Sequence, residues 1–190
     1  MSNIFEMKDN TANPGPLGLV GFGLATIMLN LHNAGFHALD TMVLSMGLLL
    51  GGLLQLIVGL LEYKKNNMFG MIAFGAYGAF WLSLIFLMIL PKMGLGEAPA
   101  PEAMGYYCSV WAIFSLGMFF ATMKANMASR ILFAAVTVLF ALLAIADFTG
   151  IHGVKTLAGF EGIFAGSLAL YIAIAELYHD VYGKKILPLG

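Results

Sequence analysis

The stretch Asn13-Pro14-Gly15-Pro16-Leu17-Gly18-Leu19 stands where a polar N-terminal stretch meets the first long apolar segment of the chain. An Asn followed closely by two prolines is typical of a helix start, because Asn caps free N–H groups and proline has no N–H to leave unpaired. We therefore expect a helix to begin here, with Asn13 as its cap. Free N–H groups and the helix dipole attract anions, so this end is a candidate anion site.

Apolar segments of membrane-spanning length follow this helix start. The chain is 61% hydrophobic and only 10% charged, whereas a soluble domain carries about 25% charged residues, and its mean hydropathy is +0.90. Crossing the hydrocarbon core takes about 20 mostly apolar residues. The sequence therefore predicts an all-α membrane protein with six transmembrane helices, at residues 17–35, 41–61, 69–90, 104–123, 131–148 and 157–178.

The basic residues are distributed unevenly between the two sides of the membrane. Because cytoplasmic loops carry the excess of Lys and Arg, both termini are expected in the cytoplasm. This arrangement gives an N-terminal tail at 1–12, a six-helix transmembrane domain at 13–182 and a C-terminal tail at 183–190. Seven of the nine basic residues lie on the predicted cytoplasmic side, namely Lys8, Lys64, Lys65, Lys124, Arg130, Lys184 and Lys185, against Lys92 and Lys155 on the other.

Several classes of function are disfavoured by composition and motifs. A net charge of −1 offers no basic field for nucleic acid. The single cysteine, Cys108, allows no internal disulfide and fits no zinc or redox motif. The four histidines fall at segment ends, whereas a membrane haem needs axial imidazoles deeper in the bundle. With no recognisable nucleophile motif or metal-spaced His/Glu pair, we expect no enzyme, no cofactor and no metal.

Polar groups at membrane depth are candidates for function, because hydrocarbon offers them no partner. Gln55 fits a helix–helix hydrogen bond as well as a pore-lining role. Glu161, early in the sixth segment, either lies at the interface or handles protons in a wet vestibule. Glu62 and Glu176 lie near the predicted cytoplasmic boundary, where solvation at the interface explains them.

Two glycine patterns, Gly47-x-x-x-Gly51 and Gly162-x-x-x-Gly166, predict close helix contacts within or between subunits. The alternative interpretation is that some of these glycines leave room for a solute path.

The chain resembles the acetate uptake transporter family, and most closely its bacterial succinate–acetate permeases. The stretch from Asn13 to Leu19 is similar to the family signature Asn-Pro-Ala-Pro-Leu-Gly-Leu, and the similarity continues through residues 26–33, 59–65 and 137–145. The resemblance implies six helices per subunit, a ring-like homohexamer and a solute path within each subunit. It also implies transport of acetate and, as in bacterial members, succinate, with proton coupling.

The resemblance also implies a constriction of the solute path. The family's Phe, Tyr and Leu fall on Phe22, Tyr77 and Val136, which on their own would be interpreted as buried packing. Valine is one methylene smaller than leucine, so the constriction is expected to be slightly wider than one that admits acetate alone. Gly15 replaces the family's Ala and leaves more room near the backbone amides of the helix start.

These features together predict transport of acetate and related small carboxylates across the cell inner membrane, coupled to protons. A bare anion in an apolar neck is costly, so either a proton or a wet neck is needed, and Tyr77 can donate its hydroxyl to the carboxylate. The alternatives are a passive small-anion channel and a non-transporting membrane scaffold. The predicted solute-binding residues are Asn13, Pro14, Gly15, Pro16, Leu17, Gly18 and Gln55, with Glu161 as a candidate for proton handling.

Overall fold

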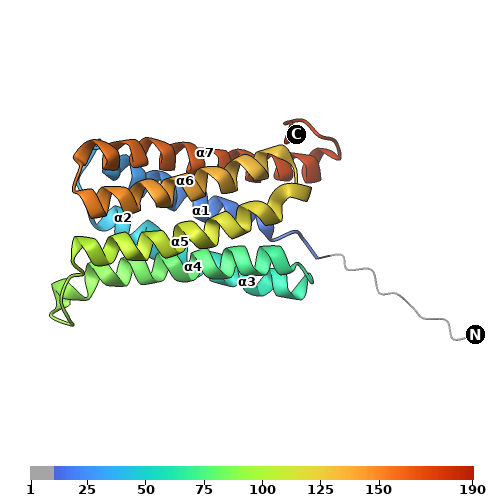
Figure 1. Cartoon of the computed structure of the whole chain (residues 1–190). Coiled ribbons are helices and arrows are strands. Elements are labelled where there is room, and N and C mark those ends of the chain that lie inside the picture. The colour runs from blue at the N-terminus through green and yellow to red at the C-terminus, as the bar shows by residue number, and fades with distance from the viewer. Residues whose placement is uncertain (1–10) are drawn as a thin grey trace, which may run out of the picture.

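The computed structural model describes residues 11–190 as a bundle of long helices lying side by side (Figure 1). The second span is built from three consecutive pieces, one of which is a π-helix, and two other spans end in a short 3₁₀ turn. The elements in chain order are α1 (Gly15–Asn33), α2 (Thr41–Met46), the π-helix η1 (Gly47–Leu54), α3 (Gln55–Lys64), α4 (Met68–Ile89), the 3₁₀ turn η2 (Pro91–Met93), α5 (Pro101–Ala121), the 3₁₀ turn η3 (Thr122–Lys124), α6 (Met127–Thr149) and α7 (His152–Tyr182).

Six helical stretches within residues 11–190 are long and apolar enough to cross a bilayer. The prediction of an all-α protein with six membrane-spanning helices is therefore confirmed. The last helix is longer than predicted, because Gly150 ends α6 with a left-handed φ of 65° and α7 begins only two residues later. Lys8 and most of the predicted N-terminal tail lie outside the described residues.

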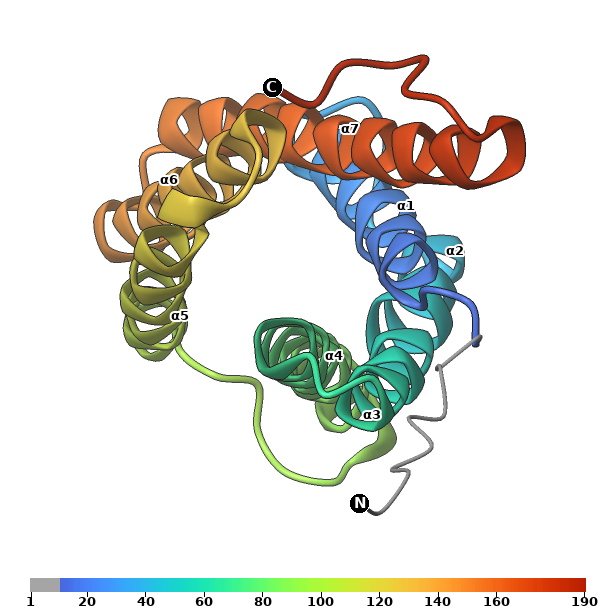
Figure 2. The ribbon, with the colours of Figure 1, turned by 90° about the vertical axis from the view of Figure 1, so that its right-hand side faces the viewer.

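The spans form a ring in end view (Figure 2). Going around the ring, α5, α6, α7 and α1 follow one another, and α1 then contacts the η1–α3 span, which packs on α4. The ring closes between α4 and α5 through large side chains. The rings of Phe80 and Trp111 lie 5.1 Å apart, and the hydroxyls of Ser83 and Tyr107 lie 2.6 Å apart.

Glycines allow neighbouring helices to touch. A β-carbon added to Gly23 in α1 would lie 2.7 Å from the carbonyl oxygen of Gly166 in α7, and one added to Gly166 would lie 2.8 Å from that of Gly23. A β-carbon on Gly51 would lie 2.5 Å from the Trp81 ring. Both predicted glycine patterns therefore make close helix contacts within one chain.

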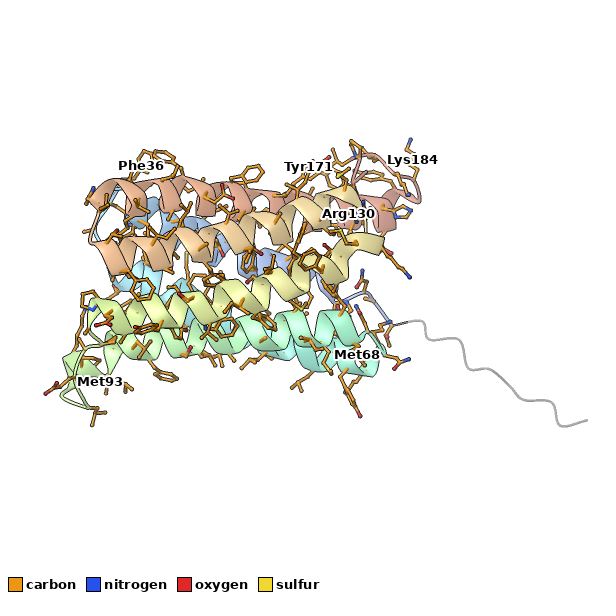
Figure 3. All side chains as sticks on the ribbon, viewed as in Figure 1. Phe36, Met68, Met93, Arg130, Tyr171 and Lys184 are labelled. Carbon is orange, nitrogen blue, oxygen red and sulfur yellow. The ribbon has the colours of Figure 1, made fainter. Side chains whose placement is uncertain are left out.

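One end of the bundle carries most of the basic residues, and we call it the basic end (Lys64, Lys65, Lys124, Arg130, Lys184 and Lys185). Helix α1 begins there and α7 ends there, and Figure 3 labels Arg130 and Lys184 at this end and Phe36 and Met93 at the opposite one. Residues 183–190, predicted as a tail, fold back onto α6, where the Ala128 N–H donates to the Leu189 carbonyl at 2.8 Å. The Tyr171 hydroxyl donates to the Pro188 carbonyl at 2.7 Å.

Candidate functional site

A cavity of about 250 Å³ runs from the basic end into the middle of the bundle. Asn13 and Asn67, which precede α1 and α4, line it at the basic end, and Tyr77 and Val136 line it at mid-depth. Most of its wall is apolar, contributed by residues such as Leu132. This volume is below the range of about 300–1,000 Å³ typical of pockets for drug-sized ligands, so the cavity suits a small solute.

The structure brings the three predicted constriction residues together in this cavity. Phe22, Tyr77 and Val136 all line it, and all three are buried. Their helices start at the same end, and the three residues lie seven, nine and nine positions after those starts. With a rise of about 1.5 Å per residue, they share a layer about 10–14 Å deep. The rings of Phe22 and Tyr77 are 6.0 Å apart.

An aromatic cluster of Phe80, Tyr107, Trp111 and Phe140 packs behind Tyr77. Phe140 stacks on the Tyr77 ring at 6.5 Å and meets the edge of Phe80 at 4.9 Å. None of the four lines the cavity. These rings separate the cavity from the opposite end of the bundle. The sequence alone did not single out this cluster, because its members are spread over three helices and look like ordinary core residues.

The hydroxyl of Tyr77 already has a partner. It shares a hydrogen bond of 2.9 Å with the Ser115 hydroxyl in α5, and both residues are buried. The prediction that Tyr77 donates to a solute carboxylate must therefore account for Ser115, which can serve as the donor to Tyr77 and leave the phenolic O–H available.

Gln55 is an unpaired polar group in the same layer. It lies nine residues before the end of α3 at the basic end, is 1% exposed and lines the cavity. Its Oε1 has no hydrogen-bond partner among residues 11–190. The helix–helix hydrogen bond considered from the sequence is therefore not made by this atom. An unpaired buried polar atom costs about 1–3 kcal/mol, which a solute can recover by hydrogen bonding.

The π-helix η1 ends directly before Gln55. A β-carbon on Gly21 of α1 would lie 2.6 Å from the Leu50 carbonyl oxygen, so α1 rests on the backbone of η1. Wide π turns inside helices often occur at functional sites. The sequence predicted one continuous helix over this span, because no residue pattern distinguishes a π turn from an α turn.

The predicted anion site at the start of α1 must be corrected. The helix begins at Gly15 with Pro14 as its N-cap residue, and the Asn13 Oδ1 accepts from the Gly15 N–H at 3.0 Å. Pro14 and Pro16 have no N–H, and the Leu17 and Gly18 N–H groups both bond to the Pro14 carbonyl. From Pro14 to Gly18, the described structure thus leaves no unpaired N–H for a solute. Of residues 13–19, Asn13, Gly15 and Leu19 line the cavity, and Pro14, Pro16, Leu17 and Gly18 do not.

Two carboxylates face the start of α1 instead. Glu62 is 2% exposed and Glu176 is half-buried, and both line the cavity. The prediction that interfacial solvation explains them is wrong for Glu62, because the ring of helices places its carboxyl group inside the bundle. The sequence indicates that both are charged residues near a segment end, but it does not indicate that they line the same cavity.

Glu161, the residue predicted to handle protons, does not line this cavity. It lies nine residues after the start of α7, in the half of the bundle away from the basic end, and is partly buried.

Comparisons with known proteins identify the family to which the chain belongs. The sequence profile described as the GPR1/FUN34/yaaH family matches residues 3–183 of the chain. The chain belongs to this family. The succinate-acetate/proton symporter SatP of Escherichia coli, strain K12, is 47% identical over 179 residues, which cover 94% of this chain and 95% of that protein. A protein of Methanothermobacter thermautotrophicus is 44% identical over 189 residues, covering 96% of this chain and 93% of its own length.

The fold of the GPR1/FUN34/yaaH family is also seen in a solved structure. The structure of the bacterial acetate channel SatP superposes with a TM-score of 0.94 at 46% sequence identity, covering 95% of this chain and 100% of that one. The resemblance to acetate transporters noted in the sequence is therefore confirmed, and the chain is a multi-pass membrane protein. The two SatP descriptions name a symporter and a channel, and neither names an enzyme.

Proposed function

We propose that this protein transports acetate and succinate across the cell inner membrane together with protons. The observation that carries the proposal is the small cavity that ends at the layer of Phe22, Tyr77 and Val136, with the unpaired Gln55 Oε1 beside it. The apolar wall contacts the carbon chain of the solute. The Gln55 carbonyl accepts a hydrogen bond from a carboxylic O–H, and a neutral acid crosses an apolar neck at far lower cost than an anion.

The orientation and assembly belong to the same proposal. The basic end faces the cytoplasm, since Lys and Arg concentrate there, and the cavity is then open to the cytoplasmic side. The chain assembles as a homohexamer in which each subunit has its own solute path, as the family resemblance implies. Native mass spectrometry of the purified protein measures the number of subunits directly.

Flux into liposomes that contain only this protein tests the proposal. We expect labelled succinate and acetate to enter faster than into protein-free liposomes, and an inward proton gradient to drive succinate accumulation. Flux that follows only the solute gradient and voltage would instead identify a passive anion channel. No flux at all would identify a non-transporting membrane protein.

A blocking substitution tests the constriction. Val136→Phe adds a ring to the layer of Phe22, Tyr77 and Val136 and is expected to reduce acetate flux at least tenfold. Val138→Phe, at a residue of the same helix that is 47% exposed, is not expected to reduce it. Size-exclusion chromatography confirms that both variants are folded. Wild-type flux in a folded Val136→Phe protein would refute the constriction.

A further inference from the structure

Two carboxylates share the mouth of the cavity, and each is held by an asparagine. The Asn67 Nδ2 donates to Glu62 Oε2 at 2.7 Å, and the Asn13 Nδ2 donates to Glu176 Oε2 at 3.3 Å. Glu62 is at the end of α3 and Glu176 near the end of α7. We call these two residues the carboxylate pair. Two helices that are far apart in sequence, α3 and α7, thus bring two acidic groups to the same opening of the cavity.

The carboxylate pair occupies the place where an anion would approach the start of α1. A β-carbon on Gly15 would lie 3.3 Å from Glu62 Oε1 and 3.2 Å from Asn13 Oδ1, so the first residue of the helix faces Glu62 directly. The positive end of a helix dipole stabilises a nearby carboxylate. Since the protein's own negative charge already fills this position, a solute anion that enters the cavity meets repulsion.

Among residues 11–190, the basic groups near the carboxylate pair are Lys65, His179 and Lys185, and Lys185 lines a second pocket together with Glu176 and His179. Lys65, directly after α3, interacts electrostatically with Glu62, and His179 interacts with Glu176 from the same helix. Lys65 also donates to the Thr11 carbonyl. A solute carboxylate therefore adds negative charge to a mouth that already holds two carboxylates, in surroundings where charges interact more strongly than in water.

An independent observation, an unpartnered polar atom further inside the same cavity, points to a hydrogen-bonding position for a solute there. The Gln55 side chain is almost completely buried, with only 1% of its surface exposed, and its Oε1 has no partner among the described residues. Buried polar atoms in native proteins are nearly always hydrogen-bonded. The unpaired carbonyl faces a cavity that is reached past the carboxylate pair, which makes the pair part of a route rather than a surface feature.

We propose that the carboxylate pair is the proton-binding site of transport, an inference that rests on the proposed function. A solute that arrives through the neck as a neutral acid transfers its proton to one carboxylate oxygen of Glu62 or Glu176, so the O–H bond of the solute breaks and an O–H bond of the glutamic acid forms. The solute leaves as an anion, and the glutamic acid then releases the proton to water at the mouth; in the reverse direction the same steps run backwards. Because coupling between two sites is reciprocal, the anion increases proton affinity by the same factor by which the proton increases anion affinity.

Replacing both acids by amides tests the proposal. The Glu62→Gln, Glu176→Gln double variant keeps the shape of the side chains and cannot bind a proton. In liposomes with an inward proton gradient, we expect the double variant to accumulate at least tenfold less succinate than the wild type. Exchange of labelled for unlabelled succinate at equal pH is expected to persist. The matched control is Glu97→Gln, an exposed acid at the opposite end.

A binding measurement complements the flux measurement. Purified wild-type protein in weakly buffered detergent is expected to take up about one proton when succinate is added at neutral pH, and the double variant none. This readout does not require the variant to complete a transport cycle. Circular dichroism and size-exclusion chromatography establish that the variant is folded.

Several outcomes would overturn the proposal. If proton-driven succinate accumulation persists in the double variant, the carboxylate pair is not the proton-binding site. If this accumulation is lost in Glu161→Gln alone, the proton-binding site is Glu161 instead. If wild-type flux ignores the proton gradient, the pair has no coupling role, although the solute path stands. If the wild type shows neither flux nor succinate-linked proton uptake, the proposed function fails as well.

Discussion

Tyr77 belongs to the cavity wall and to a helix contact at the same time. Its ring faces Phe22 in the proposed constriction, while its hydroxyl bonds to Ser115 and joins α4 to α5. Because α4 and α5 contact each other mainly through large side chains, this hydrogen bond helps to hold the ring in place. The position of Tyr77 in the cavity wall therefore depends on a residue 38 positions away in sequence.

We predict that Tyr77→Phe and Ser115→Ala have similar effects. Each breaks the same buried hydrogen bond, and such bonds in membrane proteins are worth on average about 0.6 kcal/mol. Melting temperatures in detergent and acetate exchange in liposomes measure both consequences. If Tyr77→Phe abolishes exchange while Ser115→Ala does not, the hydroxyl acts on the solute directly.

Helices α1 and α7 contact each other through their backbones at Gly23 and Gly166. Contact at this distance leaves no space for a methyl group on either side. The crossing matters for the site, because α1 carries Phe22 and α7 carries Glu176. A shift of one helix against the other would change the positions of Phe22 and Glu176 relative to each other, and with them the proposed constriction and the mouth of the cavity.

Gly23→Ala is predicted to destabilise the protein by about 1–3 kcal/mol, the range typical of overpacking. The matched control is Gly75→Ala in α4, where an added β-carbon meets no atom of a neighbouring helix within 4 Å. Thermal unfolding in detergent compares the two. Equal melting temperatures for both variants would mean that α1 and α7 can separate at no cost.

At the scale of the whole molecule, the cavity and the aromatic cluster define two unequal halves. The cavity reaches the basic end, and Phe80, Tyr107, Trp111 and Phe140 fill the bundle behind Tyr77. This arrangement corresponds to access from one side. A complete transport cycle requires these rings to move, because a solute cannot pass through them as they are packed.

Cysteine labelling tests this asymmetry. In a Cys108→Ala background, Ser129→Cys in the cavity wall is predicted to react with a membrane-impermeant thiol reagent applied at the basic end, and added succinate should slow the reaction. Ser83→Cys should not react from that side, because the native Ser83 side chain bonds to Tyr107 of the aromatic cluster and does not line the cavity. Equal labelling of both positions would show that the path is open throughout.

The candidate site was partly predictable from the sequence. Phe22, Tyr77 and Val136 came from a family resemblance, and the structure places them in one layer because their helices start at the same end. Glu62 and Glu176 were interpreted as solvated, because the sequence shows their distance from a segment end but not which way the helix faces. The prediction of free backbone N–H groups near Asn13 was also wrong, because these groups are hydrogen-bonded and their pairing depends on local backbone geometry.

The sequence by itself determined that the protein crosses a membrane six times, because runs of about 20 apolar residues with few charges have no other stable environment. It also determined the uneven distribution of basic residues between the two ends. Only the tertiary structure decided which polar groups meet inside the bundle. Cavity walls, the π turn before Gln55 and the carboxylate pair arise from contacts between helices distant in sequence, and hydrophobicity along one segment does not specify those contacts.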